Sequence, residues 1–115
     1  MSVSLLTAKE LLGLFELDDA GNVLYCRLDL SRLPGGTSRD MAGHNFYDEV
    51  APFENVEEFR GHVAEFTRST KPADSFVFDC RYEGSAQPVK VLLARIREQV
   101  NQKNTKSVLV HIRPK

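Results

Sequence analysis

The sequence predicts an α+β fold, in which a five-stranded antiparallel sheet carries short helices and one longer helix on one face. Two strand-like segments come first, one helix with a continuous apolar stripe follows, and three more strand-like segments end the chain. Two strands before the helices and three after them cannot all be joined by βαβ crossovers, so an antiparallel sheet fits this order best. With 115 residues, 42% of them hydrophobic, the chain predicts a single domain with one core.

The N-terminal part of the chain predicts a hairpin followed by irregular structure. Residues 11–17 and 23–28 have the apolar character of strands, and the Asp-Asp-Ala-Gly-Asn run at residues 18–22 supplies the turn between them. Before the hairpin, the Thr-x-x-Glu run at residues 7–10 has the spacing of a helix capping box, which predicts a short helical turn. Proline and glycine interrupt residues 29–52, so we expect short helical turns and loops there.

The clearest helix begins after Asn55 and ends before Lys71 and Pro72. Asparagine is a favourable N-cap residue, and acidic residues occupy the first turn, where the helix dipole stabilises negative charge. Apolar side chains then recur at spacings of three and four, which predicts one buried stripe along the helix. The stripe consists of Val56, Phe59, Val63 and Phe66.

Three strands are expected after this helix. Residues 76–82 alternate between two faces, residues 89–96 are mostly apolar, and residues 107–113 place β-branched side chains on one face. Glycine and proline predict a turn at residues 83–88, and polar side chains predict a loop at residues 100–106.

The nearly balanced charge argues against several kinds of partner. The chain has 15 Lys and Arg residues against 16 Asp and Glu residues, a net charge of −1. Nucleic acids and anionic membranes call for a concentrated basic patch, so we expect neither as a partner. No apolar run approaches the roughly 18 residues of a membrane span, and no signal peptide is evident. Two cysteines are too few for a disulfide scaffold, so we expect a cytoplasmic protein.

Residues with catalytic or metal-binding chemistry are few, so we expect no enzyme. The histidines lack the spacing of a metal site, and carboxylates such as Glu49 and Glu58 have no second catalytic group at a supporting spacing. His111 alternates with apolar residues on the last strand, so we expect it to point outward. His62 lies one step off the helix stripe and is a candidate haem axial ligand, with a half-exposed surface position as the alternative.

The run at residues 43–52, Gly-His-Asn-Phe-Tyr-Asp-Glu-Val-Ala-Pro, resembles the photoactive yellow protein branch of the PAS domains. In that family the segment reads Gly-Lys-Asn-Phe-Phe-Lys-Asp-Val-Ala-Pro-Cys. The likeness continues through Glu58 and Phe59 on the expected helix and into the strands that follow. It implies a PAS domain over residues 11–115, preceded by a short N-terminal segment, residues 1–10. The PAS fold has the element order predicted above.

The resemblance does not extend to the chromophore of the family. Photoactive yellow proteins attach p-coumaric acid as a thioester to the cysteine after Val-Ala-Pro, and this sequence has Phe53 at that position. A phenyl ring is no nucleophile, so we expect no such thioester. In an ungapped register the tyrosine, glutamate, threonine and arginine of the family's chromophore pocket fall on Cys26, Leu30, Pro34 and Gly36. A shift of three in this loop brings in Thr37 and Arg39 for the last two.

These replacements predict an apolar pocket in place of a charged, hydrogen-bonded one. Its candidate walls are Cys26, Leu30, Pro34, Phe46, Phe53 and Phe78. Large side chains could fill the space and leave a solid interaction module, because protein interiors are close-packed. Alternatively, an apolar cavity survives and takes an uncharged or flat ligand, either haem or a small aromatic molecule.

From the resemblance we expect a sensory or protein-interaction module in signal transduction, without photoreception based on p-coumaric acid. A haem-binding or small-ligand-binding redox or gas sensor is the alternative, with His62 as the axial ligand. If the chain is the whole protein, it meets a signalling partner in trans or self-associates. Leu5, Leu6 and Leu11, beside the outer sheet face, would mediate that self-association or pack on the domain's own sheet.

Overall fold

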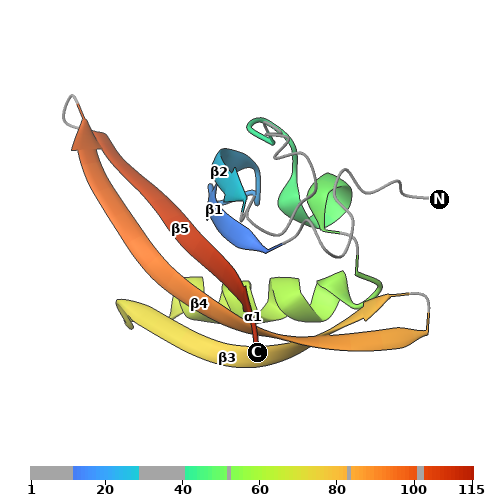
Figure 1. The fold of residues 1–115 in the computed structure, drawn as a ribbon. Helices are drawn as coiled ribbons and strands as arrows, with labels where there is room; N and C mark the ends of the chain where they lie inside the picture. The colour runs from blue at the N-terminus through green and yellow to red at the C-terminus, as the bar shows by residue number, and fades with distance from the viewer. Residues whose placement is uncertain (1–11, 29–40, 52, 83, 101–102) are drawn as a thin grey trace.

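A five-stranded antiparallel sheet forms the centre of the structure, a computed structural model that describes residues 12–28, 41–51, 53–82, 84–100 and 103–115. The strand order is β2-β1-β5-β4-β3, and all neighbours pair antiparallel, as the sequence predicts (Figure 1). The strands are β1 (Gly13–Leu17), β2 (Val23–Leu28), β3 (Ala73–Tyr82), β4 (Ser85–Val100) and β5 (Lys103–Pro114).

The strand order brings the first and last strands together in the middle of the sheet. β1 pairs with β2 on one side and with β5 on the other, so Phe15 lies opposite both Cys26 and Val110. Cross-strand partners share a face, so these three side chains point to the same side of the sheet. β4 and β5 are the longest strands and extend together beyond their neighbours (Figure 1).

Two helical segments pack on one face of this sheet. η2 (Phe46–Val50) is a single turn of π-helix, and α1 (Val56–Arg68) is the longer helix (Figure 1). Phe59, Val63 and Phe66 of the apolar stripe are buried. The predicted helix is therefore confirmed, and its stripe is buried except at Val56, which is partly buried.

The inner face of the sheet supplies the platform on which the helices pack. Phe15, Val110 and Leu93 lie in one row across β1, β5 and β4, and each side chain is fully buried. Burial of one such side chain contributes about 1.5–3 kcal/mol to folding. The row runs through the middle of the sheet, and the core extends from it on both sides.

The start of α1 is attached to the free edge of β3. Asn55 Nδ2 donates to the Asp79 carbonyl at 2.7 Å, and Asn55 Oδ1 accepts from the Arg81 backbone N–H at 3.1 Å. Asn55 occupies the predicted N-cap position, but its side chain makes no capping bond to the helix. The physical reason is that β3 is an edge strand, whose outer N–H and C=O groups need partners.

The end of α1 is attached to β4 by Arg95. Its Nη2 donates to the carbonyls of Phe66 and Ser69, both at 2.8 Å. Its Nη1 and Nε reach the carbonyls of Thr67 and Lys71, both at 3.3 Å. The last carbonyls of a helix lack intrahelical donors and carry the negative end of the dipole, so a guanidinium group suits them.

Two of the predicted connections are shorter than expected. The turn is shorter than the predicted residues 83–88, because β4 begins at Ser85 and pairs there with Tyr82. The predicted loop at residues 100–106 is wrong, because β4 and β5 stay paired as far as Val100 and Lys103. Backbone pairing with a neighbouring strand outweighs the weak strand preference of polar side chains.

Some predictions fall outside the described residues. These are the capping box at residues 7–10, the turns expected at residues 29–40 with Thr37 and Arg39, and the self-association residues Leu5, Leu6 and Leu11. Within the described part of the chain, no helix is long and apolar enough to span a membrane.

Candidate functional site

Three of the predicted pocket residues meet between α1 and the sheet, around a fourth ring. Phe46, Phe53 and Phe78 are buried, with exposed fractions of 0%, 3% and 5%. The ring of Phe59 on α1 lies among them, with its centroid 5.7, 5.5 and 5.3 Å from theirs, in that order. These separations are those of direct ring contact. The four residues form what we call the aromatic cluster.

Sequence reasoning placed Phe59 in the helix stripe but did not bring it to the pocket. The helical spacing indicated that Phe59 is buried, but no sequence pattern indicated that this helix face contacts Phe53. Of the other predicted pocket residues, Leu30 and Pro34 lie outside the described part of the chain. Cys26 is partly buried on β2 and packs against the core.

Cys80 of β3 lies in the same core as the aromatic cluster. Burial raises the pKa of its thiol to about 11, and the thiol shares a hydrogen bond with Tyr82. Burial also holds the pKa of Tyr82 above its usual range, and the Tyr82 ring meets Phe53 edge-on. A thiol that stays protonated at neutral pH is a poor nucleophile, so Cys80 acts as a small apolar core residue.

His62 is exposed on α1, where its ring covers the outside of the aromatic cluster. It stacks on Phe76 of β3 with centroids 4.4 Å apart and an interplanar angle of 16°. It also meets the Phe78 ring edge-on at 6.0 Å. No group of three or more potential metal ligands forms among the described residues, and haem ligation by His62 stays a prediction.

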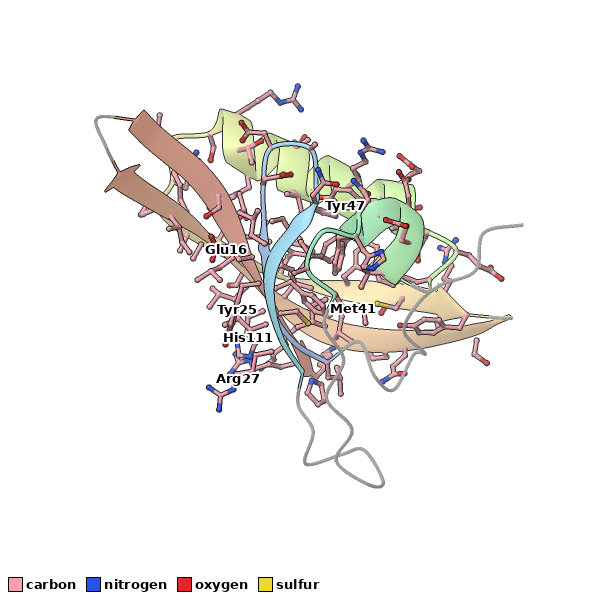
Figure 2. All side chains as sticks on the ribbon, turned by 90° about the horizontal axis from the view of Figure 1, so that it is seen from above. Glu16, Tyr25, Arg27, Met41, Tyr47 and His111 are labelled. Atoms are coloured by element: carbon pink, nitrogen blue, oxygen red, sulfur yellow. The ribbon has the colours of Figure 1, made fainter. Side chains whose placement is uncertain are left out.

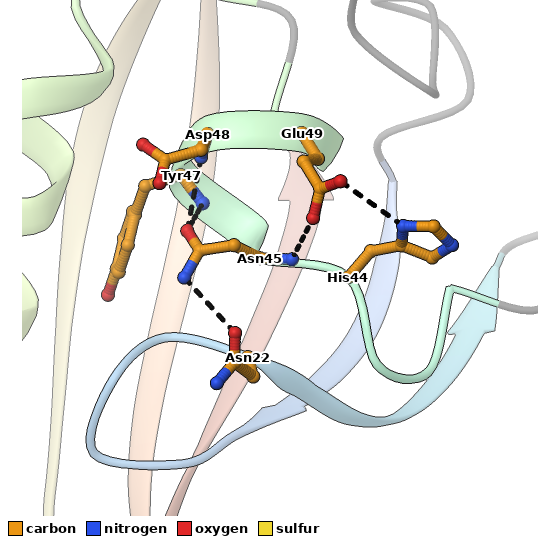
Figure 3. Close-up of polar contacts among 6 residues, drawn as sticks. All are labelled: Asn22, His44, Asn45, Tyr47, Asp48 and Glu49. Atoms are coloured by element: carbon orange, nitrogen blue, oxygen red, sulfur yellow. Dashed lines mark hydrogen bonds and ion pairs between the residues drawn. The ribbon is translucent and has the colours of Figure 1, made fainter.

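Asn45 fixes the start of η2 to the turn between β1 and β2 (Figure 3). Its Oδ1 accepts hydrogen bonds from the backbone N–H groups of Tyr47 and Asp48, both at 3.1 Å. Its Nδ2 donates to the Ala20 carbonyl at 3.0 Å and to Asn22 Oδ1 at 3.3 Å. One side chain therefore caps the helical turn and holds the hairpin beside it.

Glu49 completes this cap from the far end of η2. Its Oε2 accepts from the Asn45 backbone N–H at 2.7 Å, and its Oε1 lies 3.5 Å from His44 Nδ1 (Figure 3). The backbone hydrogen bond, followed by the contact with His44, holds the pKa of Glu49 below its usual range. These contacts give Glu49 a structural role in the turn.

A groove of about 300 Å³ opens on the other flank of α1, beside the β1–β2 turn. Arg60, Ala64 and Thr67 of α1 line it at helical spacings of three and four, so they share one flank of the helix. Leu17 and Asp19 line it from the hairpin. We call this side of α1 the open flank. No sequence pattern indicated the groove, because its walls come from segments far apart in the chain.

Tyr47 is the residue of η2 that lines this groove. Its side chain is only 8% exposed, and burial raises the pKa of its hydroxyl to about 12. Gly21 makes room for the ring, because a Cβ at Gly21 would lie 2.5 Å from Tyr47 Cε2. The φ of Gly21, +89°, also favours glycine. The Arg60 guanidinium lies over the ring, 5.2 Å from its centroid, in a cation–π arrangement.

The outer face of the sheet, opposite the helices, carries exposed apolar side chains. Tyr25, Val77 and Leu92 are 50%, 50% and 38% exposed. His111 pairs with Leu92 on this face, so its predicted outward direction is confirmed. Figure 2 shows Glu16, Tyr25, Arg27 and His111 along this side of the molecule, and Met41 and Tyr47 on the other.

Comparison with known sequences identifies distant relatives. No protein-family model matches the chain. The photoactive yellow protein of Rhodothalassium salexigens is 29% identical over 83 residues, which cover 72% of this chain and 66% of that protein. The photoactive yellow protein of Halochromatium salexigens is 29% identical over 79 residues, which cover 69% and 63%. The match spans just under two thirds of the length of either relative.

Comparison with solved structures concerns the fold. The PAS domain of BvgS from Bordetella pertussis matches with a TM-score of 0.53 and 16% identity. The match covers 94% of this chain and 78% of that chain. Together with the five-stranded sheet and its helices, it confirms the predicted fold.

Proposed function

We propose that this chain, a PAS-fold protein distantly homologous to photoactive yellow protein, is a sensory or protein-interaction module in signal transduction that carries no p-coumaric acid. The homology and the fold support a sensory or interaction role. In this proposal the module transmits a change in packing or association and catalyses no reaction.

The observation that carries the proposal is the environment of Phe53. This residue follows Val-Ala-Pro, where the family has its chromophore cysteine, and it is 3% exposed. Its ring contacts those of Phe59, Phe78 and Tyr82, at centroid distances of 5.5, 5.7 and 6.3 Å. A phenyl ring offers no nucleophile, and the close packing of these rings around it supports a filled site.

The outer face of the sheet is the interaction surface in this proposal. Tyr25 on β2, Leu92 on β4 and Val77 on β3 expose apolar surface on this one face, and exposed apolar surface favours association. The same face carries the acid Glu16 and the base Arg27, and the register places Lys90 and Arg113 on it beside Val77. A second copy related by a two-fold axis can pair Glu16 of each copy with Arg27 of the other. We therefore propose that two copies associate through this face.

Absorption spectroscopy and mass spectrometry test the chromophore part of the proposal. The protein, incubated with p-coumaric anhydride, is expected to show no visible band and no added mass after denaturation. A coloured covalent adduct would contradict this expectation. A Soret band that disappears in His62→Ala would favour a haem-binding sensor instead.

Analytical ultracentrifugation tests the interaction surface. We expect wild type to dimerise as its concentration rises, and Leu92→Lys to remain monomeric, because two like charges then meet in the interface. Thr70→Lys adds the same charge at an exposed position outside this face and is expected to behave as wild type. A wild-type protein that stays monomeric at all concentrations would contradict the proposed self-association.

A further inference from the structure

The groove on the open flank of α1 contains a hydroxyl that the described residues leave unpaired. Tyr47 lines the groove with only 8% of its side chain exposed, and no described residue forms a hydrogen bond with its hydroxyl. Tyr47 is one of the residues that line the groove, so a ligand in the groove can contact its side chain. A hydroxyl in so confined a position favours a partner from outside the protein.

Two opposite charges stand on the walls beside this hydroxyl. The Arg60 guanidinium lies over the Tyr47 ring, and its other contact, with Glu57, is long at 3.8 Å and exposed to solvent. Asp19 on the facing turn is exposed and has no hydrogen bond among the described residues. Asp18, by contrast, accepts hydrogen bonds from the backbone of its own turn. One cation and one carboxylate are thus available to a ligand.

We propose that this groove binds a free α-amino acid with an apolar side chain. The ligand carboxylate binds Arg60 and the Tyr47 hydroxyl, and the ligand ammonium binds Asp19. The apolar side chain of the ligand packs on Leu17 and Val63, which also line the groove. This inference goes beyond the proposed function, because it assigns a ligand to a site away from both the outer sheet face and the aromatic cluster.

The size and the charge of the groove favour this class of ligand over others. A volume of about 300 Å³ lies at the lower end of the range for ligand sites, which suits one small molecule. A simple anion would meet the carboxylates of Asp18 and Asp19, and a simple cation would meet Arg60. A zwitterion can pair with both Arg60 and Asp19. The apolar part of the groove disfavours ligands with polar side chains.

Isothermal titration calorimetry with L-leucine, L-isoleucine, L-valine and L-phenylalanine tests the proposal. At least one of these is expected to bind with a Kd below about 1 mM. For phenylalanine, 2-phenylethylamine lacks the carboxylate and 3-phenylpropionate lacks the amine. The corresponding analogues of the amino acid that binds best are expected to bind at least about tenfold more weakly, because each leaves one wall unpaired.

Three variants assign the binding to this groove. Tyr47→Phe removes only the hydroxyl and is expected to weaken binding about three- to tenfold. Arg60→Gln and Asp19→Asn each remove one charge and are expected to weaken it about tenfold or more. Arg68→Gln, exposed on the same helix, and Asp48→Asn, exposed on η2, are the matched controls and should bind as wild type does.

The proposal is overturned if wild type binds none of the four amino acids at about 10 mM. It is also overturned if the three groove variants bind as tightly as wild type, or if analogues without a carboxylate or an amine bind equally well. Leu92→Lys separates this proposal from the proposed function. It is expected to abolish self-association and to leave amino-acid binding unchanged.

Discussion

The two flanks of α1 pack against the rest of the protein in different ways. Toward β3, Phe59 and His62 meet a continuous set of rings, with Phe59 in contact with Phe46, Phe53 and Phe78. On the open flank, the smaller Ala64 and Thr67 leave a groove of about 300 Å³. Large rings fill the space on the β3 side, whereas the open flank faces the β1–β2 turn across the groove.

Consecutive residues of η2 serve the two flanks. Phe46 joins the aromatic cluster and Tyr47 lines the groove, and their rings meet edge-on with centroids 5.6 Å apart. Glu49 and Asn45 hold both residues in place through the cap of η2. The aromatic cluster and the groove are therefore in direct contact through this pair of rings.

Phe59→Ala disrupts the aromatic cluster on the β3 side of α1 and has the largest expected effect. Its removal leaves a cavity where three other rings meet, so we expect the free energy of unfolding to fall by about 3–5 kcal/mol. Urea denaturation measures this loss. Phe59→Leu keeps more of the side-chain volume, so its loss in the free energy of unfolding should be clearly smaller. A loss below about 1 kcal/mol for Phe59→Ala would show that the rings are not closely packed.

Arg95→Met releases the end of α1 and removes the guanidinium that lies over the Phe66 ring, while it keeps an apolar stem at this position. It leaves several helix carbonyls without their charged donor, so we expect a loss of about 2–3 kcal/mol in the free energy of unfolding. Arg68→Met, an exposed position in the same turn, is expected to cost about 0.5 kcal/mol or less. Equal losses in the two variants would contradict the anchoring role of Arg95.

Gly21→Ala disturbs the wall of the groove. Its new Cβ would lie 2.5 Å from the Tyr47 ring at a φ of +89°, so we expect a loss of about 2–3 kcal/mol and a displaced ring. Gly84→Ala has a similar φ, +81°, but open space around its Cβ. Gly84→Ala should therefore lower the free energy of unfolding by about 1 kcal/mol, the cost of the backbone conformation alone. Equal losses would show that contact with Tyr47 is unimportant.

Protonation of Glu49 loosens the cap that both flanks share and has the smallest expected effect. The pKa of Glu49 is lowered in the folded protein, so the stability it contributes is present above its unfolded value of 4.5 and is lost as the pH falls through the folded value. Urea denaturation between about pH 6 and pH 3 should show a shallower decline for Glu49→Gln than for wild type. Parallel declines would contradict this assignment.

Local patterns explain why so much of the fold could be predicted. The spacing of Phe59, Val63 and Phe66 indicated a buried helix face, and the alternation around His111 indicated which side of the last strand faces outward. The wrong predictions concern segments in which backbone pairing across the sheet outweighs the strand preference of the side chains. Residues 103–106 are polar, yet their backbone pairs with β4 and extends the hairpin of the two longest strands.

The candidate site was predicted only in part, for a related reason. Phe46, Phe53 and Phe78 were named from the resemblance, and the structure brings them together. Phe59 and Tyr47 were missed as site residues, because their roles depend on which flank of α1 faces which strand. The same holds for Asn55, whose side chain serves the edge of β3 rather than the helix.

The sequence by itself determined the type and order of the elements and most of the core, because hydrophobic periodicity acts over a few neighbouring residues. Only the tertiary structure decided that one flank of α1 is closed and the other open. It also decided that Arg95 holds the carbonyl of Phe66, 29 positions away in the chain. Such contacts depend on the register of the whole sheet, which no single segment encodes.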